Sequence, residues 1–522
     1  MNMKTLTETS TFRVLSLLLC FCFFIPAMNV SASSLQADKF KVSGIVKDAT
    51  GEPVIGASVV EKGTTNGTVT DLDGNFNLSV ASNSTIVISF IGYSDQEFHI
   101  SKDNMVLNVN LIDRVDMDAS QKAIYQAEAK TIRALMYINL TMTYQDVPFL
   151  TAPLTIDEAE CEKTDRAAIV AHIMTDLQDA AEVLPQNASS RGHITKGAAL
   201  SLLGRVALYN EKWDDAIAAY KQVQGLGYSL DPSYAKLFTQ SGETSPEIIF
   251  AVRYEGPGMS EGAAFNAHWN TPLEAMNGTI DLADAYYCKD GKPTTDTKIA
   301  ELNNEGGLDV SKPNPAHFEN RDPRLYSTLF VPGMLWNGKG GIDTSASNPY
   351  VNVYGGAAAS LSTIYVYKYF DPTDTSNSWD NGQDFYVVRY AEVLLSLAEA
   401  MVQKGGYAYS DVTALVNEVR QRADVNMPTV EEVEGTSLSK DELLEVIKHE
   451  RRVELAFEGL RLFDLYRWKE LDKAVANIEN ERTMYGLAYE ARKFNGERDY
   501  VWPLPTAELD TNKKLVQHDL WK

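Results

Sequence analysis

The spacing of apolar residues changes once along the chain, near residue 115, and this change constrains the fold more than any other feature. Between residues 40 and 112, β-branched and aromatic residues alternate with polar ones, as in Asn75–Val80 and Thr85–Phe90, which is typical of strands. From about Ser120 onward, apolar residues recur three and four positions apart, as in amphipathic helices. The sequence therefore predicts a mainly α-helical protein with loop-rich insertions and a small N-terminal β-sandwich.

Residues 1–32 have the organisation of a secretory signal peptide. Lys4 and Arg13 precede the apolar block Val14–Ile25, and the small residues at 30–32 offer a cleavage site. The block is too short to span a bilayer, although an uncleaved anchor is the alternative interpretation. Leucines, rather than small residues, precede Cys20, so no lipid anchor is expected.

The net charge of −24 argues against general affinity for nucleic acid or for anionic lipid. Only Cys161 and Cys288 lie beyond the predicted signal peptide; they could pair, but they form no disulfide framework. The histidines are scattered, and no motif for phosphate, dinucleotide or zinc binding is recognisable. No metal or cofactor is expected.

Asp73-Gly74, between two strand patterns, predicts a hairpin turn. Asp71–Asn75 has some likeness to a calcium loop, but its glycine is misplaced and Ser82 stands where glutamate is required, so a plain turn is favoured. The stretch 40–112, FKVSGIVKDATGEPVIGASVVEKGTTNGTVTDLDGNFNLSV and onward, resembles the carboxypeptidase-regulatory-like domain. In many SusC-type TonB-dependent receptors, this domain is the first module.

The helical part contains one recognisable helix pair, in which residues 195–210 and a helix from Trp213 are joined by Asn210–Lys212. This pair is typical of a tetratricopeptide-type unit. Residues 254–390 have little apolar periodicity and predict long loops. Further helices are predicted at residues 120–145, 164–184, 386–404, 411–423 and 439–470.

Several motifs resemble the SusD/RagB family in the order that the family has them. They are EAKTIRALMYINLTMTYQDVPFL (128–150), NRDPRL (320–325), FYVVRYAEVLLSLAEA (385–400), ERRVELAFEGLRLFDLYRW (450–468) and YVWPLPTAELDTNKKLVQ (500–517). The resemblance spans residues 120–522, divided into a tetratricopeptide-like part at 120–245 and a C-terminal region at 246–522. It implies a glycan-binding outer-membrane protein that covers a SusC-type receptor as a hinged lid.

Two departures from the family pattern are visible. The family usually has glycine at the position of Gln145, and its lipid-carrying cysteine and roughly its first hundred mature residues have no counterpart. The chain therefore resembles the beginning of a receptor joined to the latter part of its partner. A non-functional remnant of such a fusion is one alternative.

The helix predicted at 439–470 is dense in ions. Glu450, Glu454 and Glu458 recur at steps of four and are interleaved with arginines at 451, 452, 461 and 467. Paired carboxylates can hydrolyse glycosidic bonds, but neighbouring arginines lower the pKa of a carboxylate and disqualify it as a general acid. A structural ion-pair network is favoured over catalysis, and the chain is not expected to be an enzyme.

The loops of 254–390 hold three of the seven tryptophans and offer the better candidate site. An exposed aromatic ring gives the apolar face of a sugar a flat platform, and nearby amides or carboxylates can bind its hydroxyls. The alternative is that such rings pin the loops to the body. The candidate glycan contacts are Trp269, Asn270, Trp336, Asn337, Tyr350, Tyr354, Trp379 and Asp380. Core packing is instead expected for Trp213, Tyr390, Trp468 and Trp502.

These observations predict a non-catalytic glycan-binding protein of the SusD type. The resemblance implies that it works with a SusC-type, TonB-dependent outer-membrane importer in nutrient uptake. A peptide-binding or protein-interaction scaffold is the alternative of a different class. The protein is expected to be exported, and to be periplasmic or held at the outer membrane through its partner rather than by lipid.

Overall fold

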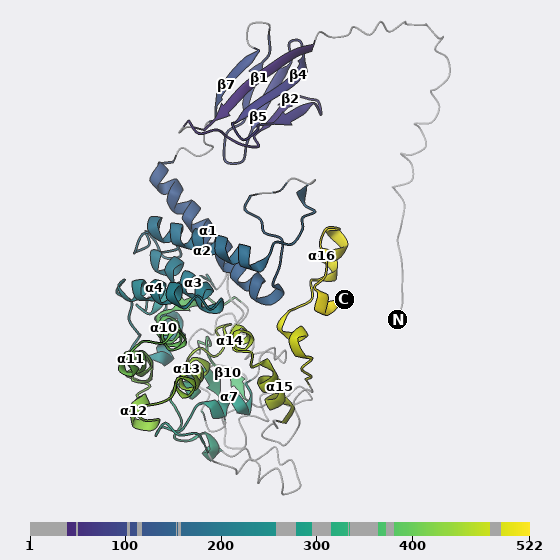
Figure 1. Ribbon diagram of the computed structural model, residues 1–522. Coiled ribbons are helices and arrows are strands. Elements are labelled where there is room, and N and C mark those ends of the chain that lie inside the picture. Colours follow the sequence, from purple (N-terminus) through teal and green to yellow (C-terminus); the bar gives the residue numbers. More distant parts are fainter. Residues whose placement is uncertain are drawn as a thin grey trace, which may run out of the picture. The chain divides into compact units, whose positions relative to one another are not determined.

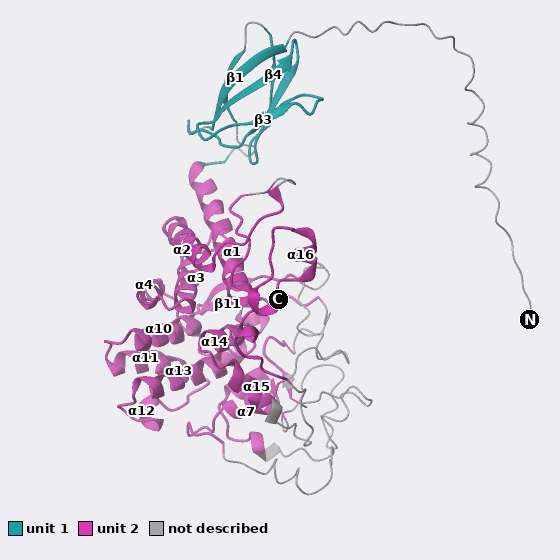
Figure 2. Cartoon of the chain, turned by 45° about the vertical axis from the view of Figure 1, so that its right-hand side comes forward, with its two compact units in different colours: residues 1–118 teal, residues 119–522 magenta. Residues whose placement is uncertain are grey.

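The computed structural model describes residues 39–48, 51–101, 105–111, 117–152, 154, 158–256, 278–294, 315–331, 334, 364–371, 380–480 and 492–522. The predicted signal peptide at 1–32 lies outside these residues. The chain divides into two compact units, Met1–Asp118 and Ala119–Lys522 (Figures 1 and 2). Each unit is described by itself.

The N-terminal unit is the predicted β-sandwich. One sheet has the strand order β4-β1-β7 and the other has β3-β2-β5-β6; β1 and β7 are parallel and the other pairs are antiparallel. Alternate residues of β4 (Phe76, Leu78 and Val80) are buried, as the period of two requires. The strands are β1 (Lys39–Lys47), β2 (Ser58–Glu61), β3 (Gly67–Val69), β4 (Asn75–Ala81), β5 (Thr85–Ser89), β6 (Gln96–His99) and β7 (Val106–Asn110).

The turn at Asp71–Asn75 is closed by hydrogen bonds to the side chain of Asp71. Asp71 Oδ1 accepts hydrogen bonds from the backbone nitrogens of Asp73 (3.0 Å) and Asn75 (2.8 Å). Gly74 has φ +76°, a conformation that explains the glycine. The hairpin prediction is wrong, because β3 and β4 belong to different sheets. The long antiparallel pairing of β4 with β1 draws β4 into the other sheet, so the turn connects the two layers.

The second unit is mainly helical, and successive helix pairs stack on one another (Figures 1 and 2). Helix α1 packs on α2, α3 on α4, and α10 on α4, α11 and α13. The helices are α1 (Ala119–Tyr144), α2 (Arg166–Val183), α3 (Lys196–Tyr209), α4 (Trp213–Gln224), α5 (Tyr234–Leu237), α7 (Ile280–Ala285), α9 (Arg324–Thr328), α10 (Tyr390–Lys404), α11 (Tyr409–Arg420), α12 (Val430–Val433), α13 (Lys440–Glu454), α14 (Arg461–Arg467), α15 (Leu471–Asn480) and α16 (Thr506–Thr511).

The predicted helix pair is confirmed as α3 and α4. Gly204 allows the close approach of these helices, because a Cβ at this position would lie 2.5 Å from the ring of Tyr220. Asp165 and Ser439 explain where α2 and α13 begin, since their side chains accept hydrogen bonds from the first-turn nitrogens. Ser439 forms a full capping box with Glu442.

Two predicted helices differ from the observed elements. Residues 386–389 belong to strand β11 (Phe385–Arg389), which pairs with β8 (Ile248–Val252), and the helix begins only at Tyr390. The β-branched and aromatic run at the start of this stretch favours a strand. The helix predicted at 439–470 is divided into α13 and α14, with Phe457 (φ +61°) and Gly459 (φ +79°) between them. A second short two-stranded antiparallel sheet consists of β9 (Leu329–Phe330) and β10 (Tyr365–Val366).

Cys161 and Cys288 are free thiols, so the pairing that the sequence left open is not formed. Within the described ranges, no helix has both the length and the apolar character that crossing a bilayer demands.

Gln145, the position where the family usually has glycine, follows α1 with φ +63°. A side chain in this left-handed conformation costs free energy that glycine does not pay. We expect Gln145→Gly to raise the free energy of unfolding by about 0.5–1 kcal/mol. Denaturant titration followed by tryptophan fluorescence measures this, because all seven tryptophans lie in the helical unit. Gln145→Ala is the control and should give no gain; an equal gain from both variants would contradict the argument.

Candidate functional site

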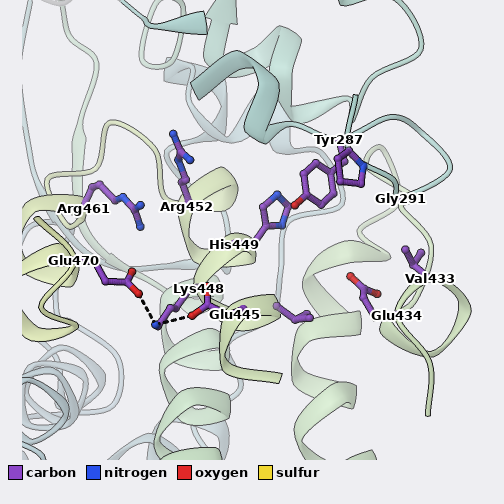
Figure 3. Close-up of a pocket in the computed structure, with 12 residues that line it drawn as sticks. Tyr287, Gly291, Val433, Glu434, Glu445, Lys448, His449, Arg452, Arg461 and Glu470 are labelled. Atoms are coloured by element: carbon purple, nitrogen blue, oxygen red, sulfur yellow. Dashed lines mark hydrogen bonds and ion pairs between the residues drawn. The ribbon is translucent and has the colours of Figure 1, made fainter. Parts of the chain in front are cut away.

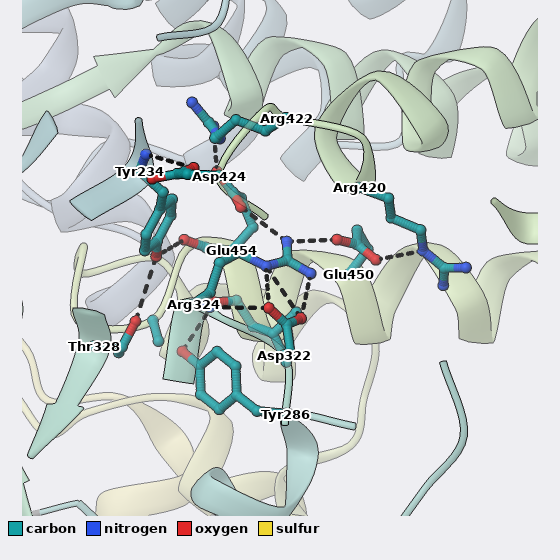
Figure 4. Close-up of polar contacts among 12 residues, drawn as sticks. Tyr234, Tyr286, Asp322, Arg324, Thr328, Arg420, Arg422, Asp424, Glu450 and Glu454 are labelled. Carbon is teal, nitrogen blue, oxygen red and sulfur yellow. Dashed lines mark hydrogen bonds and ion pairs between the residues drawn. The ribbon is translucent and has the colours of Figure 1, made fainter. Parts of the chain in front are cut away.

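A cluster of buried ions surrounds Glu454, the last residue of α13 (Figure 4). The Glu454 side chain has no exposed surface, and its Oε1 accepts hydrogen bonds from Arg389 (2.7 Å) and Arg422 (2.9 Å). Arg324 donates to the other oxygen at 2.9 Å. Three guanidinium groups from α9, β11 and the segment after α11 therefore converge on one carboxylate.

The cluster extends in both directions from Glu454. Three further glutamates each join two cations that come from different parts of the chain, and Asp322 joins Arg324 alone among the described residues. The additional pairs are Glu247 with Arg389 and Arg422, Glu450 with Arg324 and Arg420, and Glu458 with Arg389 and Lys368.

The carboxylates of Glu450, Glu454 and Glu458 are held ionised. Burial alone would raise the pKa of Glu454, but Arg389, Arg422 and Arg324 outweigh burial and place this pKa far below its usual range. The pKa values of Glu450 and Glu458 are lowered for the same reason. Burial lowers the pKa of Lys368 to about 8, although Glu458 opposes this effect. Glu450, Glu454 and Glu458 do belong to a structural ion-pair network, but the predicted partners are wrong: Arg451, Arg452 and Arg467 pair instead with Asp464, Asp281 and Glu399. The ionised, inaccessible carboxylates of Glu450, Glu454 and Glu458 are unsuited to general acid catalysis.

The ion cluster also fixes the chain on either side of the aromatic-rich segments, which comprise residues 257–277, 335–363 and 372–379. Lys368 follows the second segment, and its Nζ donates to the carbonyl oxygens of Glu454 and Ala456, both at 3.0 Å. Arg389 follows the third segment. Because both cations bind Glu458, the residues after these two segments are held beside the same helix end.

The ends of the aromatic-rich segments also contact one another. Gly278, after the first segment, donates its N–H to the carbonyl of Ile364, after the second, at 3.0 Å. Gly256, before the first segment, approaches Asp380, after the third, so closely that a Cβ on Gly256 would lie 2.2 Å from the Asp380 carbonyl oxygen. We call Gly256, Gly278, Ile364 and Asp380 the insertion ends.

Side-chain contacts reinforce this arrangement. The backbone N–H of Tyr254 donates to Asp384 at 3.0 Å, and Arg191 joins the same carboxylate at 2.7 Å. The N–H of Tyr386 donates to the hydroxyl of Tyr369 at 3.2 Å. The two contact pairs formed by the insertion ends are therefore attached to one buried framework.

The predicted glycan contacts lie mostly outside the described residues. This applies to Trp269, Asn270, Trp336, Asn337, Tyr350, Tyr354 and Trp379. Asp380 is described, is half-buried, and is itself one of the insertion ends. For the other seven residues, glycan contact stays a prediction.

The core-packing expectation holds for three of four aromatic residues. Tyr390 is buried, while Trp213 and Trp468 are half-buried. Trp502 corrects the expectation, because 47% of its surface is exposed. Its indole N–H donates to the hydroxyl of Tyr466 at 2.8 Å, and this hydrogen bond holds the ring at the surface.

A pocket of about 450 Å³ lies between α13, α14 and the residues after α7 (Figure 3). No pattern in the sequence indicated this pocket. Tyr287 and His449 stack on one side of the pocket, with ring centroids 4.0 Å apart and an interplanar angle of 19°. Burial lowers the pKa of His449, whose Nε2 lies 2.7 Å from the carbonyl of Ala285. The neutral, stacked imidazole extends the apolar surface of the tyrosine ring.

Charged side chains from α13 and α14 complete the wall of this pocket. Lys448 joins Glu445 (2.8 Å) and Glu470 (2.9 Å), as Figure 3 shows. Arg452 forms an ion pair with Asp281 of α7, and Arg461 reaches the pocket from α14. Among the residues that line this pocket, the sequence drew attention only to those in the ionic motif on α13 and α14. Nothing in the sequence indicated a role for Tyr287.

Within the described ranges, no group of three or more potential metal ligands occurs.

Residues 246–521 match the model of the SusD family, and residues 42–120 match that of the CarboxypepD_reg-like domain. SusD-like protein P2 of Formosa agariphila is 24% identical over 422 residues, which cover 78% of this chain and 75% of that protein. TonB-dependent receptor SusC of Bacteroides thetaiotaomicron is 48% identical over 102 residues, which make up 18% of this chain but 10% of the receptor.

The solved structures that this chain resembles include other SusD-like proteins. A SusD-like carbohydrate binding protein from Bacteroides fragilis has a TM-score of 0.64 and 27% identity, with 77% of this chain and 81% of that chain covered. A laminarin binding SusD-like protein has a TM-score of 0.55 and 26% identity, with 78% and 80% covered. Since the family model matches more than half of the sequence, the chain belongs to the SusD family and carries a CarboxypepD_reg-like domain ahead of its family region.

Proposed function

We propose that this protein binds glycans without cleaving them and works with a TonB-dependent outer-membrane importer in nutrient uptake. Membership in a family with carbohydrate-binding relatives supports the ligand class. The 48% identity of the N-terminal part to a SusC receptor supports the association with such a receptor and a location at the outer membrane. The protein is exported and reaches that membrane through its partner.

The observation that carries the ligand proposal is the joining of the insertion ends. Trp269, Trp336 and Trp379 are far apart in sequence, but the two ends of the first segment contact the residues that follow the second and third segments. Segments with adjacent ends can bring their rings to a single oligosaccharide. Each ring then covers an apolar sugar face, and Asn270, Asn337 and Asp380 bind hydroxyl groups.

The buried ion cluster supports binding without hydrolysis. Its carboxylates are ionised and already accept hydrogen bonds from arginines or Lys368, so none is available to protonate a glycosidic oxygen. These residues rigidify the framework that carries the aromatic-rich segments.

Replacement of Trp269, Trp336 and Trp379 by alanine, singly and together, tests the proposal. Isothermal titration against soluble polysaccharides, including laminarin, should show a loss of about tenfold for each ring that stacks on the ligand, because such a stack contributes roughly 1–1.5 kcal/mol. Trp502→Ala is the matched control: it removes an exposed indole outside these segments and should leave the affinity unchanged. Unaltered affinity in the triple variant, or binding of peptides but no glycan, would contradict the proposal.

A further inference from the structure

One cation that lines the pocket of Figure 3 has no ion-pair partner among the described residues. Among its described lining residues, nearly every ionised side chain has a partner of opposite sign: Glu434 pairs with Arg420, Lys448 with Glu445 and Glu470, and Arg452 with Asp281. Arg461 is the exception. It makes no hydrogen bond or ion pair with any residue that the structure describes.

Arg461 is also poorly solvated. It is half-buried at the start of α14, and its guanidinium lies 5.7 Å from the centre of the Trp468 ring. Burial and the nearby Arg452 lower its pKa, and they outweigh the opposite effect of Asp464, Glu470 and Asp281, none of which forms an ion pair with it. A partly desolvated guanidinium without an acceptor is costly, and an anionic group that enters the pocket would remove this cost.

We propose that this pocket binds a carboxylate-bearing sugar, a uronic acid residue, whose carboxylate pairs with Arg461. The planar guanidinium can hold both oxygens of a carboxylate at once. The stacked pair Tyr287–His449 gives the sugar ring an apolar wall, and the volume of about 450 Å³ lies in the range of small-molecule sites. The inference rests on the proposed glycan-binding function and adds acidic sugars to its ligand class.

The acidic residues of the pocket are compatible with this ligand. Glu434 pairs with Arg420, while Glu445 and Glu470 share Lys448 and Glu470 also pairs with Lys473. The remaining lone pairs of these carboxylates can accept hydrogen bonds from sugar hydroxyls. A neutral sugar would use the same wall and acceptors but would leave Arg461 without a counter-charge. The carboxylate of the sugar therefore distinguishes the expected acidic ligand from a neutral sugar.

The test compares an α-1,4-linked tetragalacturonate with its methyl ester, which has the same sugar backbone but carries a methyl group in place of the charge on each carboxyl group. Isothermal titration should show binding of the acid at least tenfold tighter than that of the ester. Arg461→Gln should remove this difference, whereas Arg461→Lys should retain part of it. Lys212→Gln, which removes an exposed cation outside the pocket, is the matched control and should change nothing.

Three results would overturn the inference: equal affinity for acid and ester, an unchanged preference in Arg461→Gln, or displacement of the acid by millimolar sulfate, which would indicate a general oxyanion site. Thermal unfolding of each variant verifies that it is folded. A neutral polysaccharide is measured in parallel. If the neutral polysaccharide binds and its binding depends on Trp269, Trp336 and Trp379, but the acid does not bind, the acidic-sugar inference fails and the proposed function stands. If neither glycan binds, the proposed function itself fails.

Discussion

Replacement of Glu454 by glutamine is expected to destabilise the helical unit by roughly 3–5 kcal/mol. The carboxylate has no exposed surface and accepts hydrogen bonds from Arg324, Arg389 and Arg422. The amide keeps the shape of the side chain but removes its charge, so three buried guanidinium groups lose a shared counter-ion. An uncompensated buried charge accounts for most of the loss.

Denaturant titration followed by tryptophan fluorescence measures this effect, because the N-terminal unit contains no tryptophan and does not contribute to the signal. Glu445→Gln is the matched control. It makes the same chemical change on the same helix, but its side chain is exposed, and its ion pair with Lys448 contributes at most about 1 kcal/mol. Similar losses in the two variants would show that the cluster around Glu454 contributes no special stability.

Acidification should unfold the helical unit by protonating the same cluster. The pKa values of Glu450, Glu454, Glu458 and Asp464 are lowered in the folded protein, because nearby cations outweigh the effect of burial. The unfolded chain therefore binds protons more tightly. This contribution to stability is complete above the ordinary pKa of 4.5 that applies to glutamate, and it is lost as pH falls through the lower folded-state values.

We expect the free energy of unfolding to fall by several kcal/mol between about pH 5 and pH 2, since a tenfold change in proton affinity at one carboxylate corresponds to about 1.4 kcal/mol. Urea titrations at fixed pH steps, followed by tryptophan fluorescence, measure the slope. Glu454→Gln should give a shallower slope, because one of the four groups no longer titrates. A pH-independent stability in this range, or the same slope in the variant, would refute the linkage.

The sequence was sufficient to predict most elements of the fold. Period two and period three-to-four spacing distinguished the sandwich from the helices, and Asn210–Lys212 marked the turn between α3 and α4. The density of charges at 450–467 correctly indicated a structural ion-pair network, but not its partners. The cations that bind Glu450, Glu454 and Glu458 come from other parts of the chain, and the neighbouring Arg451, Arg452 and Arg467 bind other carboxylates.

Features that depend on distant partners could not be read from the sequence. Residues 386–389 pair with β8, a partner far away in the sequence, and the Asp73-Gly74 turn fails to make a hairpin because β1 pairs with β4. Likewise, Tyr287 and His449 are separated by much of the chain, so nothing local indicated their stacking. The sequence likewise did not indicate that Glu247 and Arg422, which lie outside α13 and α14, belong to the ion cluster.

The joined insertion ends have an evolutionary consequence. Because main-chain contacts at Gly256, Gly278, Ile364 and Asp380 join the ends of the aromatic-rich segments to a common base, the stretches between those ends can diverge or be exchanged without disturbing the helices beneath. Under the proposed function, a lineage can thus acquire a new sugar preference through replacements within these segments. For the engineer, the same four positions are natural junctions at which to graft segments from a relative.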